Sequence, residues 1–297
     1  MIIVRLKGGL GNQMFQYALG RRLAEKRGTK LKLDTIFLVN RLPRKNFVFR
    51  DYDLDIFQVQ ADFTRFSRFA GVFNNIAFPL YYFYLKIRQF FNIHYVVREK
   101  KDYIFDESVL DSPGNVYLDG YWQSGKYFKD IEGVIRKDFT FKNGLGKNGM
   151  IMAEKIKNSN AVCVNVRRAD YVSNPLNRDF FGTIGYDYYK KAEEVIASKT
   201  KHLYFFVFSD DINWCKDNLK FNHPVVFVGR EYAGKKWQQY LQLMIMCKHF
   251  IIPNSTFAWW AAWLSENKNK IIIAPKNWVS GPSINTDDLI PPSWIRI

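Results

Sequence analysis

Apolar and polar positions at the start of the chain follow the pattern of a βαβ unit. A short apolar run, Ile2–Leu6, is followed by the glycine-rich turn Lys7–Gly11 and then by good helix formers over Gln13–Arg27. The next apolar run covers Lys30–Asp34. We therefore expect a strand, a tight turn, a helix and a second strand in that order.

From about residue 150 onward the same alternation becomes regular. Short apolar runs predict strands at Ala161–Val166, Leu203–Ser209, Val225–Val228, Phe250–Pro253 and Lys270–Ala274. The segments between them predict helices at Tyr186–Ser198, Ile212–Leu219, Lys235–Cys247 and Phe257–Leu264. Such regular alternation favours a parallel, doubly wound sheet.

The middle of the chain has no such period. Residues 60–100 are rich in Phe and Tyr, and Lys142–Gly149 has the glycine, asparagine and lysine content of a linker. We place a boundary there and predict two domains, 1–148 and 149–297. The predicted fold class is α/β, with two Rossmann-like domains facing a cleft that binds ligands at the carboxyl ends of the strands.

Composition narrows the class of protein. A chain of 297 residues with 47% hydrophobic content can build real cores, which excludes a disordered or fibrous protein. The formal charge of +16, from 44 Lys and Arg against 28 Asp and Glu, attracts phosphates. Nucleic acid, an anionic membrane and a sugar-nucleotide pyrophosphate all fit this charge.

The cysteines and the N-terminal residues indicate a cytoplasmic protein. Cys163, Cys215 and Cys247 are odd in number and lack C-x-x-C spacing, which argues against a disulfide framework or a zinc module. Charges near the N-terminus interrupt what would be the apolar part of a signal peptide. Phe69–Leu85 is uncharged but short of a span of about 20 residues, so a buried or interfacial helix is expected there.

Gly8–Gln13 lies where the first strand meets the first helix. Backbone N–H groups and the helix dipole at such a turn favour an anion or an oxygen-rich ligand. A dinucleotide would fit, since Gly9 and Gly11 are followed by Asp34 at the position of a ribose-binding acid. Met14 at the third glycine position counts against it. A tight turn without a ligand is the other alternative.

Two adjacent arginines, Arg167 and Arg168, would emerge at the carboxyl end of the predicted strand Ala161–Val166. A planar guanidinium pairs bidentately with phosphate oxygens, and each charge-assisted hydrogen bond is worth about 1.5–3 kcal/mol. The pair suits a phosphate clamp, with Asp170 placed to orient one arginine. A surface ion pair beyond a strand end is the alternative.

The predicted strand Leu203–Ser209 ends in a serine, and Asp210 and Asp211 follow it. Their carboxylates suit the N–H groups of a guanine edge or the hydroxyls of a ribose. Capping of the next helix is the other use of this pattern, and different residues can fill the two roles.

A fourth polar group stands at the start of the last predicted helix. Asn254, Ser255 and Thr256 bring side-chain and backbone donors to the helix N-terminus, which suits a pyrophosphate. Trp259 and Trp260 are expected to pack in the core, with a stacking platform for a base or a sugar as the alternative.

Together these segments resemble the bacterial α-1,2-fucosyltransferases, GDP-fucose-dependent enzymes that build blood-group-like epitopes on surface polysaccharides. The likeness extends over most of the chain, through Gly8–Ala18, Gly120–Phe128, Arg167–Arg168, Phe208–Asp211 and Asn254–Trp260. It implies an inverting two-domain transferase of the GT-B type. Residues 149–297 would hold the nucleotide sugar, and residues 1–148 would bind the acceptor.

Three positions depart from the family's pattern. The motif usually reads His-x-Arg-Arg-Gly-Asp, whereas this chain has Asn165 and Ala169 at its first and fifth positions. Asparagine can hydrogen-bond but cannot transfer a proton near neutral pH, so a role of that histidine does not carry over. Gly125 replaces a more usual glutamate.

The resemblance implies that Arg167 contacts the pyrophosphate and that Asn12 positions the acceptor or the fucose. We predict Arg167, Asp170 and Asn12 as catalytic residues. Asp170 is the one candidate base, and an oxocarbenium-like transition state lessens the need for a strong one. The predicted GDP-fucose-binding residues are Gly9, Gly11, Gln13, Asn165, Arg167, Arg168, Ser209, Asp210, Asp211, Asn254, Ser255, Thr256 and Phe257.

Neither a metal nor a further cofactor is expected. Asp51–Asp55 contains two overlapping D-x-D patterns, which many other glycosyltransferases use to hold a metal. The pattern lies far in sequence from Arg167 and Ser255, and its alternation indicates a strand or turn with one apolar face. Arginines can supply the positive charge that a metal would bring.

The expected partners are GDP-fucose and a galactose-containing or lipid-linked glycan, with transfer to the 2-hydroxyl of a galactose. No nucleic acid partner is expected. Phe69–Phe91 would form a buried layer or lie peripherally on the anionic inner face of the cytoplasmic membrane. The rival functions are an oxidoreductase or nucleotide-sugar-modifying enzyme that uses the Gly9-x-Gly11 loop, and a basic membrane- or nucleic-acid-binding protein.

Overall fold

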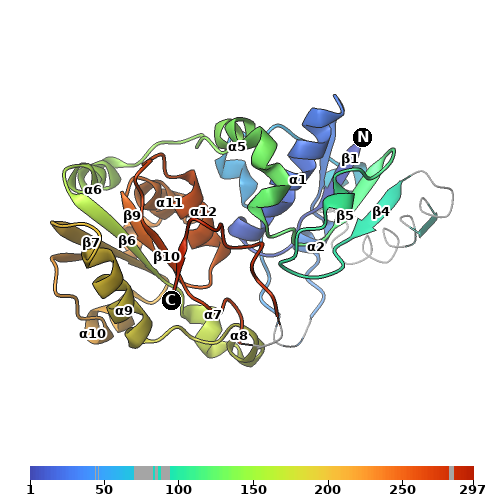
Figure 1. The fold of residues 1–297 in the computed structure, drawn as a ribbon. Helices are drawn as coiled ribbons and strands as arrows, with labels where there is room; N and C mark the ends of the chain where they lie inside the picture. Colours follow the sequence, from blue (N-terminus) through green and yellow to red (C-terminus); the bar gives the residue numbers. More distant parts are fainter. Residues whose placement is uncertain (44, 46, 70–82, 84–85, 88–93, 281–283) are drawn as a thin grey trace. The chain divides into compact units, whose positions relative to one another are not determined.

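The computed structural model of the chain describes residues 1–43, 45, 47–69, 83, 86–87, 94–280 and 284–297, which form two compact units (Figure 1). The first unit comprises Met1–Lys142 and Asn285–Leu289, and the second comprises Asn143–Ile284 and Ile290–Ile297. The chain changes unit within the linker-like stretch. Nothing in the sequence pattern indicated that Asn285–Leu289 would group with the first unit.

The first unit is built on a parallel five-stranded sheet with the order β3-β2-β1-β5-β4. Its strands are β1 (Ile2–Arg5), β2 (Leu31–Asp34), β3 (Asp62–Phe63), β4 (Tyr95–Arg98) and β5 (Val116–Asp119). The predicted strand, helix and strand at the start of the chain are confirmed. Helix α1 (Leu10–Lys26) begins at Leu10, earlier than the predicted Gln13.

Helix α1 packs closely on β1. A Cβ at Gly20 would overlap the side chain of Val4, so a glycine is required for this approach of helix and strand. The fully buried amide of Gln16 accepts from the N–H of Lys7 at 3.0 Å and donates to its C=O at 3.1 Å. The helix thereby fixes the chain where it leaves the first strand.

The other helices of the first unit are short: α2 (Ile36–Val39), η1 (Leu54–Ile56), α3 (Arg65–Phe69), η2 (Glu107–Val109), η3 (Gly125–Ile131) and α5 (Glu132–Asp138). Asp51–Asp53 has no regular secondary structure and leads into η1, which includes Asp55. Most of Phe69–Phe91, for which a buried or membrane-facing helix was predicted, lies outside the described residues. Within the described ranges, no helix combines the length and the apolar character needed to cross a membrane.

The second unit is built on a parallel six-stranded sheet with the order β11-β10-β9-β6-β7-β8. Its strands are β6 (Asn160–Val166), β7 (Leu203–Ser209), β8 (Val225–Val228), β9 (His249–Ile251), β10 (Ile272–Ala274) and β11 (Ile295–Arg296). The first five confirm the predicted strands and the parallel sheet. From β8 to β11 the order is the 3-2-1-4-5-6 arrangement of a doubly wound fold.

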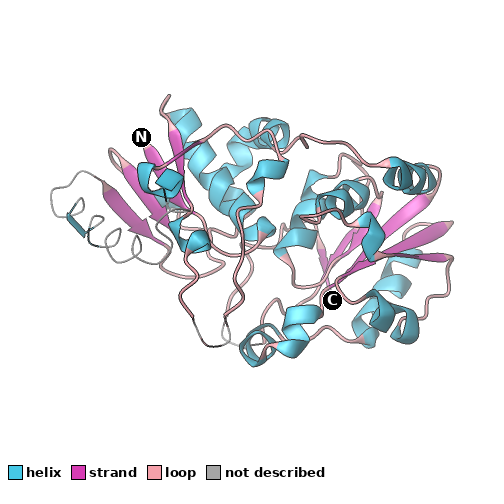
Figure 2. Ribbon diagram, turned by 180° about the vertical axis from the view of Figure 1, so that it is seen from behind, coloured by secondary structure: helices cyan, strands magenta, loops and turns pink. Residues whose placement is uncertain are grey.

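Helices flank this sheet on both faces (Figure 2). They are α6 (Lys147–Lys157), α7 (Ala169–Ser173), α8 (Pro175–Phe181), α9 (Tyr186–Ala197), α10 (Ile212–Asn218), η4 (Arg230–Tyr232), α11 (Gln238–Ile245) and α12 (Thr256–Leu264). The four predicted helices are present as α9 to α12. Helix α11 begins later than the predicted Lys235, because Trp237 adopts a left-handed backbone conformation with φ of 61°.

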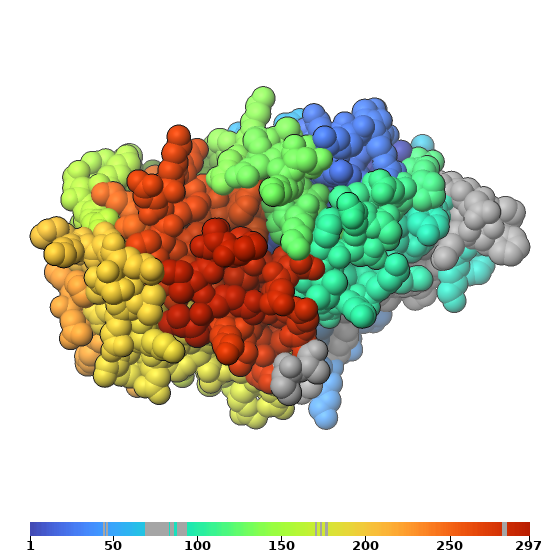
Figure 3. Space-filling view, in the orientation of Figure 1, coloured from blue at the N-terminus to red at the C-terminus, as the bar shows by residue number. Residues whose placement is uncertain are grey.

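Alternate residues of the strands build the core of the second unit. Val162 and Val164 of β6 belong to the same apolar cluster as Tyr189 of α9, whereas Phe208 of β7 packs against Tyr240 of α11 at a ring distance of 5.4 Å. Figure 3 shows the α9 region (yellow) beside the C-terminal residues (red) on one face of this unit.

The apolar helix α12 completes this core. Trp259 and Trp260 have no exposed surface, which confirms the prediction that they pack inside. Burying a large apolar side chain stabilises a fold by about 1.5–3 kcal/mol, so these two residues contribute strongly to the second unit.

Candidate functional site

The polar groups predicted in the second half gather at one edge of one sheet. The strand order reverses between the neighbouring strands β6 and β9, and ligands of open α/β sheets bind outside the carboxyl ends of strands at such a point. Arg167–Arg168 follows β6, Asn254–Thr256 follows β9, and Ser209–Asp211 ends the adjacent strand β7.

Arg167 is held by the carboxylate of Asp210. Its Nη1 lies 2.6 Å from Asp210 Oδ2 in an ion pair whose side chains are 27% and 8% exposed. The other oxygen, Oδ1, accepts the N–H groups of Arg168 at 2.9 Å and Ala169 at 3.2 Å. Asp210 thus anchors the arginine and its loop, a use that the sequence did not indicate. Direct contact of Asp210 with a nucleotide stays a prediction.

Arg168 is held differently. Its guanidinium lies 3.7 Å above the ring of Trp214, and its Nε lies 3.6 Å from Asp211 Oδ2. Asp211 Oδ1 accepts from the N–H of Trp214 at 3.2 Å, which confirms the capping role considered for this stretch. Ser209 Oγ accepts from the N–H of Asp211. Arg168 is therefore held against α10, whereas Arg167 is the more exposed of the two arginines.

Asn165, which stands where the family usually has histidine, is 7% exposed. Its Nδ2 donates to the C=O of Phe208 at 3.2 Å, and its C=O accepts from the hydroxyl of Tyr189 at 3.2 Å. The asparagine therefore ties the end of β6 to β7 and α9. Asp170 is the second residue of α7, but its side chain lies outside the described part of the structure, so its role as a base stays a prediction.

Helix α7 links the arginines to the turn after β9. The Tyr171 hydroxyl donates to the C=O of Asn254 at 3.1 Å, and the Tyr171 ring lies 5.7 Å from the guanidinium carbon of Arg167. Asn254 is 2% exposed, and its Nδ2 donates to the C=O groups of Phe181 at 2.8 Å and Trp278 at 3.1 Å. Its Oδ1 has no hydrogen-bond partner among the described residues.

Ser255 is the N-cap of α12, and its side chain makes no capping bond within the described structure. Thr256 and Phe257 form the first turn of this helix. The first N–H groups of a helix have no partner inside it, and the dipole there favours negative charge. This helix start, next to Arg167, suits a phosphate group.

In the first unit, the Gly8–Gln13 turn is shaped by backbone strain and by a buried glutamine. Gly8 has φ of 77°, the left-handed region that favours glycine, and Gly9 is the N-cap of α1. The fully buried Gln13 donates to the C=O of Asp51 at 2.7 Å and accepts from the N–H of Asp53 at 3.0 Å. Its amide therefore holds the Gly8–Gln13 turn and the Asp51–Asp53 segment together. Contacts of Gly9, Gly11 and Gln13 with a ligand stay predictions.

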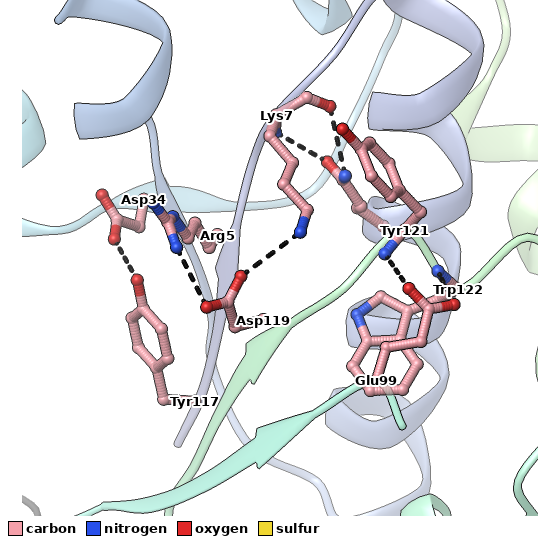
Figure 4. Close-up of polar contacts among 9 residues, drawn as sticks. Arg5, Lys7, Asp34, Glu99, Tyr117, Asp119, Tyr121 and Trp122 are labelled. Carbon is pink, nitrogen blue, oxygen red and sulfur yellow. Dashed lines mark hydrogen bonds and ion pairs between the residues drawn. The ribbon is translucent and has the colours of Figure 1, made fainter. Parts of the chain in front are cut away.

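The dinucleotide alternative depended on Asp34, and the carboxylate of this residue is buried and accepts hydrogen bonds from the protein itself. It is 1% exposed and accepts from the Tyr117 hydroxyl at 2.5 Å and the Ile36 N–H at 3.0 Å (Figure 4). A ribose-binding acid needs an accessible carboxylate, so this position speaks against a dinucleotide at the first turn.

Asn12 forms a hydrogen bond with Gln123, a residue to which the sequence analysis assigned no role. Its Oδ1 accepts from Gln123 Nε2 at 2.8 Å. Strands β1 and β5 are neighbours in the first sheet, and the two amides come from the chain segments that follow these strands. Gln123 lies inside the Gly120–Phe128 motif, and that motif was the available signal for it.

Comparisons with known proteins identify relatives of this chain among glycosyltransferases. The α-1,2-colitosyltransferase of Escherichia coli is 31% identical over 100% of this chain and 99% of its own length. The O-antigen biosynthesis glycosyltransferase WbnK of Escherichia coli is 29% identical over 98% of this chain and 99% of its own. Galactoside alpha-(1,2)-fucosyltransferase 1 of Mus musculus is 30% identical over 50% of this chain and 41% of its own.

The fold is likewise shared with a solved structure. FUT1 of Arabidopsis thaliana superposes with a TM-score of 0.51 at 10% identity, over 98% of this chain and 74% of the other. This confirms the predicted α/β fold of the GT-B type, in which each of the two units has a parallel sheet. Residues 100–297 match the model of glycosyl transferase family 11. With this match and the full-length relative in Escherichia coli, the chain belongs to glycosyl transferase family 11.

Proposed function

We propose that this glycosyltransferase moves L-fucose from GDP-fucose to the 2-hydroxyl of a galactose in a glycan, with inversion and without a metal. The observation that carries the proposal is the placement of Arg167 and the start of α12 at the strand-order reversal between β6 and β9. The names of the α-1,2-transferring relatives support the linkage.

The departing GDP gains negative charge as its bond to the sugar breaks. Arg167 can present a planar guanidinium to the pyrophosphate while Asp210 holds it in place. The N–H groups at the start of α12 add further donors. Removing one such donor from an active site commonly lowers kcat by about 10²–10³-fold, so these groups can supply most of the leaving-group stabilisation.

The acceptor hydroxyl is the other reactant. Asn12 and Gln123 place two hydrogen-bonded amides on the chain segments that follow the neighbouring strands β1 and β5. Amides donate to and accept from sugar hydroxyls, so this pair suits a pyranose better than a phosphate. We assign the acceptor, or the fucose that it attacks, to Asn12.

Nucleotide-activated colitose is a second candidate donor. The relative that matches the whole chain at 31% identity is named an α-1,2-colitosyltransferase, so the choice between the two sugars needs its own test. Turnover with the GDP derivatives of fucose and colitose, compared at equal concentration, decides it. Faster transfer of colitose would replace fucose in the proposal and leave the nucleotide site unchanged.

GDP is expected to raise the melting temperature of the protein more than UDP does. A ligand at 100 times its Kd stabilises the native state by about 2.7 kcal/mol. Differential scanning fluorimetry with GDP and UDP at matched concentrations measures the difference. Equal shifts would mean that the protein does not distinguish the base.

Activity is expected to persist in excess EDTA, because Arg167 and the start of α12 supply the positive potential that a metal would bring. Asp53→Asn should retain turnover, since the backbone N–H of Asp53, and not its carboxylate, bonds to Gln13. Fucose transfer is measured with and without chelator. Loss of turnover that manganese or magnesium restores would contradict the metal-free mechanism.

A further inference from the structure

Glu99 directly follows β4, and its carboxylate binds the loop that leaves the neighbouring strand β5 (Figure 4). Oε2 accepts from the N–H of Tyr121 at 2.5 Å, and Oε1 accepts from the N–H of Trp122 at 2.9 Å. The N–H of Glu99 itself donates to the C=O of Asp119 at 3.2 Å. The sheet pairing thus continues one residue beyond β4, and the side chain then clamps two consecutive backbone groups of the adjacent loop.

The loop has a conformation that needs such a clamp. Trp122 adopts φ of 56°, in the left-handed region that a residue with a Cβ seldom occupies. Its ring is 1% exposed, so the conformation is held between a buried side chain and the Glu99 carboxylate. A Cβ at Gly120 would lie 2.6 Å from Glu99 Cβ, so the loop passes as close to Glu99 as a glycine permits.

The same loop carries groups toward the first helix. The ring of Tyr121 lies 4.4 Å from Lys7 Nζ, and Lys7 Nζ lies 3.5 Å from Asp119 Oδ1. Gln123 is 7% exposed and donates to Asn12 Oδ1 at 2.8 Å. Its own Oε1 has no hydrogen-bond partner among the residues that the structure describes. The position of the loop therefore decides where the Gln123 amide stands and how the Asn12 amide is turned.

We propose that Glu99 is a positioning residue for sugar transfer, which acts through loop 120–123 and Gln123 to hold the Asn12 amide in its sugar-binding orientation. The proposal rests on the function assigned above, because it takes Asn12 as a residue that contacts sugar. The hydrogen bond from Gln123 to Asn12 Oδ1 fixes the direction in which the Asn12 amide is turned.

The chemistry of the clamp requires a carboxylate. Burial raises the pKa of the Glu99 carboxyl, although the N–H groups of Tyr121 and Trp122 and the charge of Lys7 act in the opposite direction. A neutral glutamine in its place would fit the space, but it offers one acceptor oxygen and sets an NH₂ group against the second N–H donor. Glu99→Gln therefore disturbs the loop without changing the size of the side chain.

Glu99→Gln is expected to lower kcat for transfer by about 10²-fold, the effect of displacing a positioning group by roughly 1 Å. The melting-temperature shift with GDP should not change, because the proposed function assigns the nucleotide itself to the second unit. Glu107→Gln removes an exposed carboxylate of η2 in the same unit and is the matched control, with wild-type kinetics expected. Gln123→Met leaves the clamp intact and should reproduce the kinetics of Glu99→Gln.

A double-mutant cycle separates positioning from a general loss of structure. If Glu99 acts through Asn12, Asn12→Ala combined with Glu99→Gln should be no slower than Asn12→Ala alone. Wild-type turnover of Glu99→Gln, or defects that multiply in the double variant, would overturn the inference while leaving the proposed function in place. Absence of transfer by the wild-type protein itself would overturn both.

Discussion

Arg167→Lys is expected to lower kcat for sugar transfer by about 10²–10³-fold while the protein stays folded. A lysine ammonium can keep an ion pair with Asp210, but it cannot present the planar fork of a guanidinium to a pyrophosphate. Arg167→Lys tests the role of the guanidinium more specifically than Arg167→Ala does. Arg167→Ala would also take the ion-pair partner from the Asp210 carboxylate, which is only 8% exposed.

Arg178→Lys provides the matched control for this experiment. Arg178 lies on α8 of the same unit, its side chain is 57% exposed, and its carboxylate neighbour is Asp179. Steady-state kinetics with GDP-fucose should show wild-type turnover for this variant and a loss for Arg167→Lys at an unchanged melting temperature. Near-normal turnover of Arg167→Lys would rule out the leaving-group role.

Asp210→Asn is expected to weaken both stability and turnover. The carboxylate binds Arg167 through one oxygen and the N–H groups of Arg168 and Ala169 through the other. Asparagine can keep the two backbone bonds, but it replaces the oxygen that faces Arg167 with an NH₂ group. Losing one charge-assisted contact costs about 1.5–3 kcal/mol of unfolding free energy.

The catalytic effect of Asp210→Asn follows from the freed arginine. A guanidinium displaced by about 1 Å is expected to lower turnover on the order of 10²-fold. Urea unfolding and initial rates measure the two effects, with the exposed Asp187→Asn on α9 as the control. A variant with reduced stability and unchanged turnover would show that catalysis does not depend on how Asp210 holds Arg167.

The sequence predicted the second unit well because its central strands are buried. Buried parallel strands form continuous apolar runs, and Leu203–Ser209 matches the observed β7 at both ends. Val225–Val228 also matches β8, an edge strand whose four residues are all apolar although three of them are only partly buried. Three of the strands that it missed lack this signal, since β3 and β11 have two residues each and β4 is a partly exposed edge strand. The four-residue strand β5 was also missed, although it is buried.

The sequence predicted which strand ends of the second sheet carry the candidate site, but it did not predict the contacts of the individual side chains. Residues that follow parallel strands meet at one edge of a sheet, which is why Arg167, Asp210 and Asn254 could be grouped from the sequence. The division of labour between Asp210 and Asp211 depends on side-chain directions that no local pattern encodes. The same holds for Glu99, because its clamp depends on the pairing of β4 with β5.

The C-terminal stretch Asn285–Leu289 illustrates a second limit. Asp288 accepts from the N–H of Phe105 at 2.8 Å through its carboxylate and from the Ser124 hydroxyl at 2.6 Å through its C=O. An ion pair with Lys126 completes the attachment to the first unit. These contacts join residues more than 150 positions apart, with separations of 183, 164 and 162, and nothing in the local sequence marks them.

The most direct test of the proposed function is a transfer assay with GDP-fucose and a panel of β-galactosides, followed by mass spectrometry and NMR analysis of the product linkage. We expect a product that carries one added fucose in an α-1,2 linkage to galactose, formed equally well in EDTA and lost in Arg167→Lys. Transfer to another position of the galactose, transfer from a UDP-sugar in preference to GDP-fucose and GDP-colitose, or full activity of Arg167→Lys would contradict the proposed function.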